Sequence, residues 1–129
     1  MNKTLIVGAT SDIAFNYIQK KKPDNIVIIS RDKLKTKSLY PNNRFNESIY
    51  LNLNDINEIY NKFNNYVNNF DKIIFFNGID IIKPIQFYKK DEIINSFNVN
   101  IISIFCLLSL LSKNNSIKNK SSIVIISSI

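Results

Sequence analysis

Two glycines are the residues whose placement most directly indicates chemistry, because this 129-residue sequence contains no others. Gly8 follows the apolar run Leu5-Ile6-Val7, and Gly78 follows a second apolar run that ends at Asn77. A glycine lets the backbone approach a ligand closely and adopts positive φ without steric cost. Ligands bind at the carboxyl ends of strands in parallel α/β sheets, so these positions predict a binding site there.

The segment Gly8-Ala9-Thr10-Ser11-Asp12-Ile13-Ala14 lies between an expected strand and an expected helix. Amides at a helix N-terminus bind phosphate groups, so this turn is a candidate pyrophosphate site. The Asp12 carboxylate favours the helix dipole but repels a phosphate, and its side chain must turn away. An ordinary capped turn is the alternative interpretation. The candidate binding residues of this turn are Gly8, Thr10, Ser11, Asp12 and Ile13.

Absent residue types exclude several chemistries. The chain has no histidine, which excludes Ser-His-Asp and Cys-His catalysis and histidine metal ligands, and we predict no metal site. The single cysteine, Cys106, lies in an apolar run, and we interpret it as a buried thiol in a reducing compartment. The net charge of +7 makes nucleic acid a candidate partner. However, the lysines are spread along an Asn-, Ile- and Lys-rich chain, so we predict no nucleic-acid partner.

The amino terminus and the most apolar segment both favour a cytoplasmic location. Met1-Asn2-Lys3 leads directly into an apolar run without the features of a signal peptide. The apolar segment Ile101–Leu111 is too short to span a bilayer, and a core helix is the expected identity. We therefore expect no membrane contact.

Hydrophobic periodicity predicts strands that alternate with helices along the whole chain. The expected strands are Lys3–Val7, Asn25–Ser30, Ser48–Leu53, Lys72–Asn77 and Ser122–Ser127. Continuous apolar strands between amphipathic helices predict a parallel sheet covered on both faces. We expect residues 1–129 to form one α/β domain, a three-layer Rossmann-type sheet of five strands in the order 3-2-1-4-5.

Four helices are expected between these strands. The first is capped by Ser11 or Asp12, the second covers Arg31–Leu39, and the fourth covers Asp91–Ser112. The third is capped by Asp55 and has apolar positions as far as Val67 and Phe70. The buried stripe expected for the fourth helix is Phe97, Ile101, Ile104, Phe105, Leu108 and Leu111. A polar loop is expected over Asn114–Ser121.

Four motifs in this order resemble those of the short-chain dehydrogenase/reductase family. The family's Thr-Gly-x-x-x-Gly-x-Gly is similar to the segment from Val7 to Ala14, in which the first glycine is kept. Its Asn-Asn-Ala-Gly is similar to Phe75-Phe76-Asn77-Gly78, and its Val-Asn pair is matched by Val99-Asn100. Its strand ending in Ile-Ser-Ser is similar to Ile126-Ser127-Ser128. The resemblance covers the whole chain but only the amino-terminal half of the family's usual domain.

The resemblance implies an NAD(P)(H)-dependent oxidoreductase that transfers hydride between a carbonyl and a hydroxyl carbon. In that family the asparagine of the Val-Asn pair supports a proton-relay water through a local break in the helix. The second serine hydrogen-bonds the reacting group. The resemblance thus assigns catalytic roles to Asn100 and Ser128, and cofactor contacts to Asn77 and Gly78. A tolerated helix-surface asparagine and a plain strand-end serine are the alternatives.

The residues after the second and third expected strands bear on cofactor choice. An acidic residue there binds the ribose 2′-OH of NAD, whereas arginine favours the 2′-phosphate of NADP. Arg31 therefore favours NADP(H), while Asp32 keeps NAD(H) open, and a plain surface loop is the alternative. Asn52-Leu53 resembles the family's Asp-hydrophobic pair beside the adenine, where the carbonyl oxygen of Asn52 would accept from the adenine amino group.

The family's reaction also needs a tyrosine and a lysine four residues later, both after the serine, and no such pair follows Ser128. Tyr17 and Lys21 have this spacing but lie on the helix after the glycine turn, so we interpret them as structural. We expect an amino-terminal part that is inactive alone. The alternative is a non-catalytic dinucleotide-binding or interaction module. The resemblance further implies a homodimer through helix 91–112, with a small-molecule substrate that the sequence does not identify.

Overall fold

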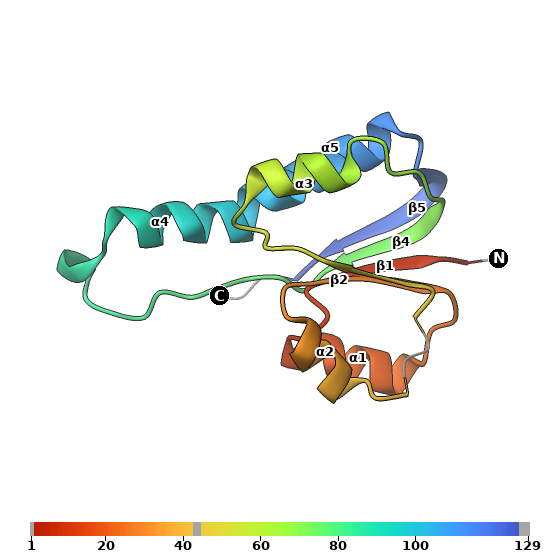
Figure 1. The fold of residues 1–129 in the computed structure, drawn as a ribbon, viewed down its shortest axis with the longest axis horizontal. Helices are drawn as coiled ribbons and strands as arrows, with labels where there is room; N and C mark the ends of the chain where they lie inside the picture. Colours follow the sequence, from red (N-terminus) through yellow and green to blue (C-terminus); the bar gives the residue numbers. More distant parts are fainter. Residues whose placement is uncertain (1, 43–44, 127–129) are drawn as a thin grey trace.

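A five-stranded parallel sheet forms the centre of the computed structural model, which describes residues 2–42 and 45–126 (Figure 1). The strand order is β3-β2-β1-β4-β5. The strands are β1 (Thr4–Val7), β2 (Ile26–Ser30), β3 (Glu47–Tyr50), β4 (Phe70–Phe75) and β5 (Ile117–Ile125). The predicted α/β class and the strand order 3-2-1-4-5 are confirmed.

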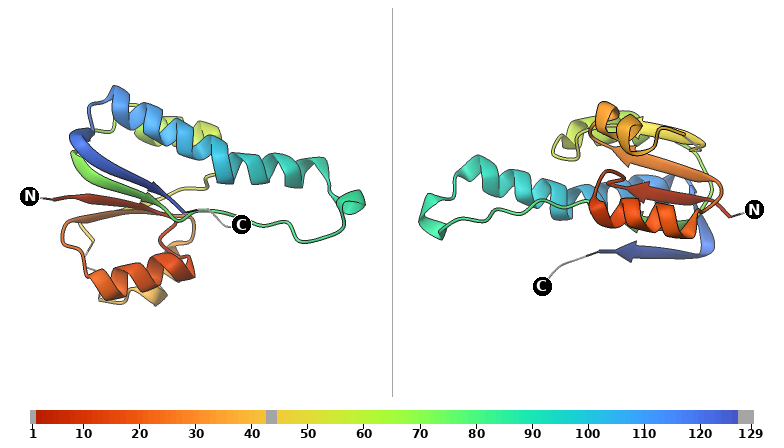
Figure 2. Two further views of the ribbon diagram at one scale, coloured as in Figure 1. Left: turned by 180° about the vertical axis from the view of Figure 1, so that it is seen from behind. Right: turned by 90° about the horizontal axis from the view of Figure 1, so that it is seen from below.

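Helices cover both faces of this sheet (Figures 1 and 2). They are α1 (Asp12–Lys21), α2 (Lys33–Leu39), α3 (Ile56–Phe63), α4 (Lys90–Phe97) and α5 (Ser103–Lys113). A 3₁₀ turn, η1 (Ile85–Phe87), precedes α4, and a π-helical segment, η2 (Asn98–Ile102), joins α4 to α5. Helices α1 and α2 lie on one face, α3 and α5 lie on the other, and α4 projects beyond the sheet.

The carboxyl ends of the strands lie level with one another. Val7 is opposite both Ile29 and Phe75, and Phe75 is opposite Ile125. At the other side of the sheet, Ser30 is opposite Tyr50. The turns that follow the strands therefore meet along one edge of the sheet, which we call the carboxyl edge.

Two hydrophobic cores hold the layers together, because the central strands β1, β2 and β4 bury apolar residues on both of their faces. The larger core joins the sheet to α3 and α5, with Phe63, Phe75, Leu107 and Leu111 fully buried in it. The smaller core joins the sheet to α1 through Ile6, Ile28, Ala14, Ile18 and Tyr40. Cys106 packs against the larger core but is only partly buried, so the expectation of a buried thiol is met in part.

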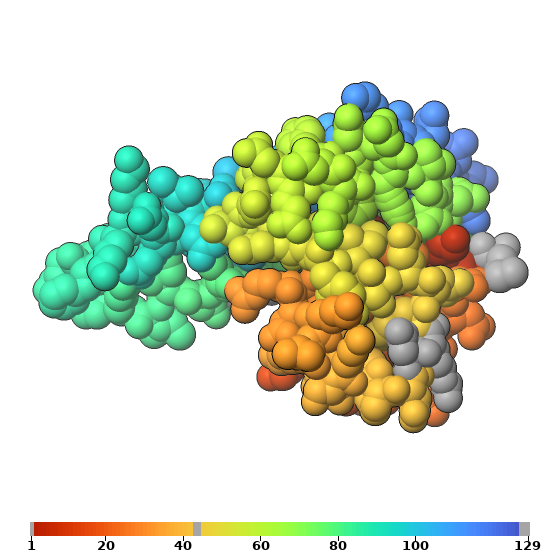
Figure 3. Space-filling view, viewed as in Figure 1, coloured from red at the N-terminus to blue at the C-terminus, as the bar shows by residue number. Residues whose placement is uncertain are grey.

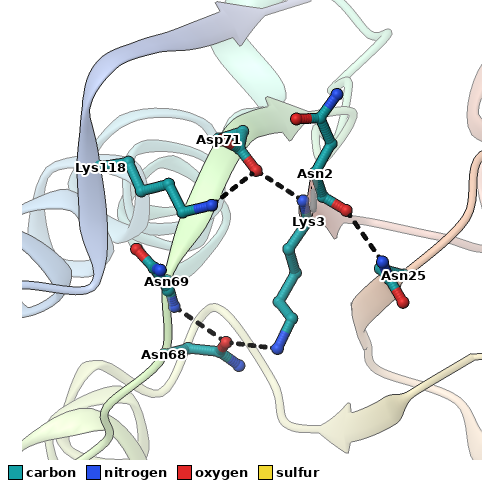
Figure 4. Close-up of polar contacts among 7 residues, drawn as sticks. All are labelled: Asn2, Lys3, Asn25, Asn68, Asn69, Asp71 and Lys118. Carbon is teal, nitrogen blue, oxygen red and sulfur yellow. Dashed lines mark hydrogen bonds and ion pairs between the residues drawn. The ribbon is translucent and has the colours of Figure 1, made fainter.

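The opposite edge, at the amino ends of the strands, is closed by a polar network (Figure 4). The Asp71 carboxylate accepts a hydrogen bond of 2.7 Å from the backbone N–H of Lys3. It also forms an ion pair of 3.3 Å with Lys118. These two contacts, the backbone hydrogen bond first, hold the pKa of Asp71 below its usual value. The network ties β1, β4 and β5 together where their pairing begins.

Helix α3 ends at Phe63, so the expectation that it continues to Phe70 is wrong. Phe70 is fully buried, but it is buried as the first residue of β4. The Asn114 side-chain amide donates to the carbonyl oxygens of Phe63 and Asn64, at 2.9 and 3.1 Å, and satisfies the helix end. The i+3 and i+4 spacing of Phe70 with the helix residues is thus a coincidence of sequence.

Strand β5 begins at Ile117, so the expected polar loop over Asn114–Ser121 is wrong from residue 117 onward. Ile117 pairs with Phe70, and a register shift separates this pair from Lys72 and Ser122. Polar residues continue the strand because their backbone groups pair with β4, which does not depend on side-chain hydrophobicity.

The long helix exposes much of the stripe that was expected to be buried. Ile104 and Leu111 are buried as expected, whereas Phe97, Ile101 and Phe105 are 54%, 45% and 69% exposed. The physical reasons are that α4 extends past the sheet and that η2 changes the helical phase. Together α4, η2 and α5 form a helical stretch, Lys90–Lys113, of 24 residues that by length and composition could cross a membrane, although Ile101–Leu111 alone is too short.

Candidate functional site

Gly8 lies where the turn after β1 contacts the end of β4. Its φ is +82°, in the region that favours glycine. A Cβ atom at this position would lie 2.7 Å from the backbone nitrogen of Asn77 and 2.9 Å from its Cα. The Gly8 N–H donates to the carbonyl oxygen of Ile29 at 2.8 Å. The turn is therefore wedged between β2 and β4, and a side chain at position 8 does not fit.

The first turn of α1 presents unpaired amides at the carboxyl edge. Ser11 caps the helix, because its Oγ accepts from the Ala14 N–H at 3.1 Å. In the part of the chain that the structure describes, the N–H groups of Asp12 and Ile13 have no acceptor, and both residues are exposed. Free amides at the positive end of a helix dipole can hold an anion. The Asp12 carboxylate lies in the same turn and opposes a phosphate unless it faces solvent.

A buried tyrosine, Tyr40, is hydrogen-bonded to the backbone of this turn. The Tyr40 hydroxyl donates to the carbonyl oxygen of Ala9 at 2.7 Å, and its ring packs beside those of Phe15 and Phe45. Burial raises the pKa of Tyr40 to about 12. Tyr40 is thus a neutral donor that fixes the backbone immediately after Gly8, and the sequence analysis did not identify it.

The end of β4 is joined to the long helix by Asn100. Its Oδ1 accepts from the Ile79 N–H at 2.8 Å, and its Nδ2 donates to the Ile79 carbonyl at 2.9 Å and to Ser96 Oγ at 3.1 Å. A Cβ atom on Gly78, which is exposed, would lie 3.4 Å from Asn100 Oδ1. Both polar atoms of the Asn100 side chain are therefore engaged within the chain.

The π-helical segment η2 frees a carbonyl oxygen that Asn77 uses. The Ser103 N–H donates to the carbonyl of Asn98, five residues earlier. The Val99 carbonyl then accepts from Asn77 Nδ2 at 2.6 Å and from Ser103 Oγ at 2.9 Å. This is the local helix break that the resemblance implies at Asn100. Asn77 Oδ1 is buried, and no described residue donates to it.

Arg31 and Asp32, after β2, differ in what their side chains do. Asp32 caps α2, because its Oδ1 accepts from the Lys35 N–H at 3.0 Å. Arg31 is exposed and forms no ion pair with any residue of 2–42 or 45–126. The Asp32 carboxylate is thus used in capping α2, whereas the Arg31 guanidinium is accessible to a ligand from solvent.

Of the two predicted site residues after β3, Asn52 lies at the surface and Leu53 lies in the core. Asn52 is exposed, and its Oδ1 accepts from the Asn54 N–H at 3.0 Å. Leu53 is 9% exposed and belongs to the larger core. Asn98, in η2, donates to Asn54 Oδ1 at 3.0 Å and connects the long helix to this turn. Only Asn52 of the predicted pair therefore has its side chain available at the surface.

The structure places most of the predicted site residues along the carboxyl edge. Around the ends of β1 and β4 lie Gly8, Thr10, Ser11, Asp12, Ile13, Asn77, Gly78 and Asn100. Arg31 and Asn52 follow the neighbouring strands β2 and β3. Ser128 lies outside the described residues, although the Ile126 N–H donates to the Phe75 carbonyl at 3.0 Å and carries the strand to this edge.

Tyr17 and Ser96 show what spacing alone can and cannot indicate. Tyr17 packs on Phe76 with ring centroids 5.7 Å apart, in agreement with its structural interpretation. Ser96 and Ser103, which support η2, were missed. They lie four residues before and three residues after Asn100, so they share its helix face. That spacing of small hydroxyl residues was the available signal.

No family model and no curated protein matches this sequence. Solved structures do match it. A short chain dehydrogenase family protein from Francisella tularensis is 21% identical, with a TM-score of 0.77, over 99% of this chain and 51% of that chain. BdcA, solved in complex with NADPH, is 16% identical, with a TM-score of 0.81, over 98% and 52%. A short chain dehydrogenase from Burkholderia cenocepacia, solved with NADP, is 13% identical, with a TM-score of 0.75, over 98% and 55%.

This chain spans little more than half the length of the solved structures that it matches. That share fits an amino-terminal portion of their fold. The resemblance predicted from the sequence is thus confirmed at the level of the fold: the chain has the Rossmann-like fold of the short-chain dehydrogenase/reductases.

Proposed function

We propose that the carboxyl edge binds a nicotinamide dinucleotide and that the chain is the amino-terminal part of an oxidoreductase of the short-chain dehydrogenase/reductase type. The observation that carries this proposal is the turn at Gly8, which has a positive φ, admits no side chain and leads into a helix with two unpaired amides. The neighbours solved with NADPH and NADP support the choice of ligand class.

The residues of the turn fit a dinucleotide pyrophosphate. The amides of Asp12 and Ile13 would hold its oxygens at the positive end of α1, with Thr10 and Ser11 at its side. The glycines Gly8 and Gly78 keep the two neighbouring turns free of side chains. No described cation lies in this turn, so the backbone and the helix dipole must carry the attraction.

The residues after β2 favour NADP(H) over NAD(H). Arg31 is accessible for a 2′-phosphate, whereas the Asp32 carboxylate is committed to capping α2. Lys33, Lys35 and Lys37 on α2 add positive charge to the same region. Asn52 Oδ1 accepts one hydrogen bond already and has a second lone pair for the adenine amino group. NAD(H) is the second choice.

Such a cofactor supplies a hydride when bound, and the chain's own residues must position the reacting groups. Asn100 would act as a positioning residue, since its side chain is used in holding Ile79. Ser128 would hydrogen-bond the reacting carbonyl or hydroxyl group. The coupled proton transfer needs a group of suitable pKa. The Tyr17 ring packs on Phe76 against the smaller core and has a structural role, so we propose that residues 1–129 alone do not turn over.

An alternative proposal is a dinucleotide-binding or interaction module that acts without catalysis. The exposed apolar side chains of the long helix support the interaction part of this proposal. Phe97, Ile101 and Phe105 lie on the helix, and the arm that ends in α4 stands clear of the body (Figure 3). Pairing of Lys90–Lys113 with a second copy would bury them, as the homodimer interpretation requires. Phe105→Glu should then convert a dimer to a monomer in sedimentation velocity.

Calorimetric titration of the 129-residue chain with NADPH and NADH tests the proposed function. We expect NADPH to bind more tightly than NADH, and Arg31→Ala to remove that preference while leaving NADH binding unchanged. Lys20→Ala is the matched control, because it removes an equal charge from the last turn of α1, away from the end of β2. Absence of heat with both cofactors at about 1 mM would refute the binding proposal.

A further inference from the structure

The carboxyl edge contains the dipeptide Asn77-Gly78, the only place in the sequence where a glycine follows an asparagine. The dipeptide lies where the chain leaves β4 and runs out toward α4 (Figure 1). In such a dipeptide the backbone nitrogen of the glycine can attack the side-chain amide carbon of the asparagine. Glycine permits this attack better than other residues, because it has no Cβ atom to obstruct the approach. The dipeptide is therefore a candidate for spontaneous covalent modification.

The attacking nitrogen is available in the folded chain. Gly78 is exposed, and no described residue accepts a hydrogen bond from its N–H. The N–H groups before and after the dipeptide are engaged, because Phe76 donates to the Val7 carbonyl at 2.8 Å and Ile79 donates to Asn100 Oδ1 at 2.8 Å. Solvent base can thus remove the proton from the Gly78 nitrogen without breaking a hydrogen bond.

The side chain that is attacked is held by a single hydrogen bond. Asn77 Nδ2, which is the leaving group, donates to the Val99 carbonyl at 2.6 Å. Asn77 Oδ1 is buried, and no described residue donates to it. A buried acceptor without a donor costs free energy, and water restores that free energy when the side chain opens. The closed position of the Asn77 amide is therefore only weakly favoured.

A second contact holds the backbone that carries the attacking nitrogen. The Asn100 side chain accepts from the Ile79 N–H at 2.8 Å and donates to the Ile79 carbonyl at 2.9 Å. The backbone at Gly78 must rotate to bring its nitrogen to Asn77 Cγ, so these two bonds oppose the reaction. Val99 and Asn100 both belong to η2. We call their contacts with Asn77 and Ile79 the η2 restraints.

We propose that Asn77 deamidates spontaneously whenever the η2 restraints open. The deprotonated Gly78 nitrogen forms a bond to Asn77 Cγ, the Cγ–Nδ2 bond breaks, and ammonia leaves after taking a proton from solvent. Water then opens the cyclic imide. Attack of water at Cγ gives aspartate, and attack at the main-chain carbonyl carbon gives isoaspartate, whose main chain runs through Cβ and Cγ. The net change is one amide and one water converted to a carboxylic acid and ammonia, without oxidation or reduction.

Either product changes the neighbouring Gly8 turn. A carboxylate at position 77 cannot donate to the Val99 carbonyl, which lies 2.6 Å from the present Nδ2. Isoaspartate also lengthens the main chain by a methylene group, at a place where the Gly8 turn already packs against the Asn77 backbone. Added negative charge there repels a pyrophosphate. We therefore expect the deamidated chain to bind NADPH less tightly, a consequence that rests on the proposed function.

Peptide mapping by mass spectrometry of the full 129-residue chain tests the proposal. The chain is incubated at mildly alkaline pH with and without urea, and conversion of Asn77 to aspartate and isoaspartate is followed. In urea we expect Asn77 to react faster than the other asparagines. Without urea its conversion should be slower by at least roughly fivefold, the factor that one hydrogen bond gives in an opening equilibrium. Gly78→Ala should slow the reaction in both solutions.

Variants in and beside η2 test the restraints. Asn100→Ala should raise the rate in the folded chain by at least roughly fivefold, because Ile79 loses both of its hydrogen bonds. Asn98→Ala is the matched control, since it removes an η2 asparagine that contacts Asn54 instead, and it should leave the rate unchanged. Ser96→Ala removes only an acceptor of the Asn100 amide, so a smaller increase in its rate keeps the test decisive if Asn100→Ala does not fold. Far-UV circular dichroism establishes which variants are folded.

The outcomes that would overturn the proposal do not involve a cofactor. Equal conversion of Asn77 in the folded and the unfolded chain would show that the η2 restraints have no effect. An unchanged rate in folded Asn100→Ala, or equal acceleration by Asn98→Ala, would overturn the proposal as well. Absence of NADPH binding by the unmodified chain would refute only the proposed function, since deamidation is measured without NADPH.

Discussion

Replacing Gly8 with alanine should destabilise the protein far more than the same change at Gly78. At position 8 the new Cβ would lie 2.7 and 2.9 Å from backbone atoms of Asn77, which cannot rotate away. The residue would also keep a φ of +82°, which a side chain rarely adopts. Backbone strain of this kind costs about 1–3 kcal/mol, and overpacking adds about 1–3 kcal/mol. We therefore expect a loss of roughly 2–6 kcal/mol.

Gly78→Ala is the matched control for this prediction. Its new Cβ would lie 3.4 Å from a single side-chain atom, Asn100 Oδ1, and Gly78 has no positive φ. We expect a change of less than about 1 kcal/mol, which is typical of exposed positions without special geometry. Urea unfolding followed by circular dichroism measures both changes. The reasoning fails if the two variants unfold at the same urea concentration.

The remaining predictions concern three side chains that hold the sheet and its turns. The pKa of Asp71 is lowered in the folded state, so its carboxylate stabilises the fold above the ordinary pKa of 3.8, and this stabilisation is lost as the pH falls through the folded-state pKa. Asp71→Asn should therefore weaken the fall in urea midpoint that accompanies acidification from pH 6 to pH 3. An unchanged fall in the variant would contradict this. Tyr40→Phe leaves the buried Ala9 carbonyl without its donor, so we expect the free energy of unfolding, measured in urea, to fall by about 1–3 kcal/mol. An unchanged free energy of unfolding would show that water replaces the hydroxyl. Asn100→Ala should accelerate hydrogen exchange of the Ile79 amide, and unchanged protection would show that the side chain does not hold this turn.

The order of elements was predictable because β1, β2, β4 and β5 each contain a continuous apolar run. Val27 and Ile28 face opposite cores, as do Leu5 and Ile6, which only a sheet covered on both faces allows. Strand boundaries were less predictable because backbone pairing extends beyond the apolar residues. Residues 118–122 of β5 are polar, and only the pairing of this strand with β4 extends it over them.

The candidate site was predictable where it depends on local sequence. Gly8 and Ser11 have roles in a turn and a cap, which short-range rules describe. The contact of Asn77 with Val99 joins residues 22 apart and exists because η2 frees a carbonyl oxygen. Tyr40 reaches Ala9 across 31 residues. Tertiary packing creates such contacts, and no spacing rule anticipates them.

NMR titration of the isotope-labelled chain with NADPH tests the central claim most directly. We predict that the amide resonances of Asp12 and Ile13 shift furthest, with Gly8 and Gly78 also affected and those of Lys72 and Lys120, at the opposite edge, unchanged. Saturating shifts at the opposite edge with none at Asp12 or Ile13 would contradict a dinucleotide site at the Gly8 turn.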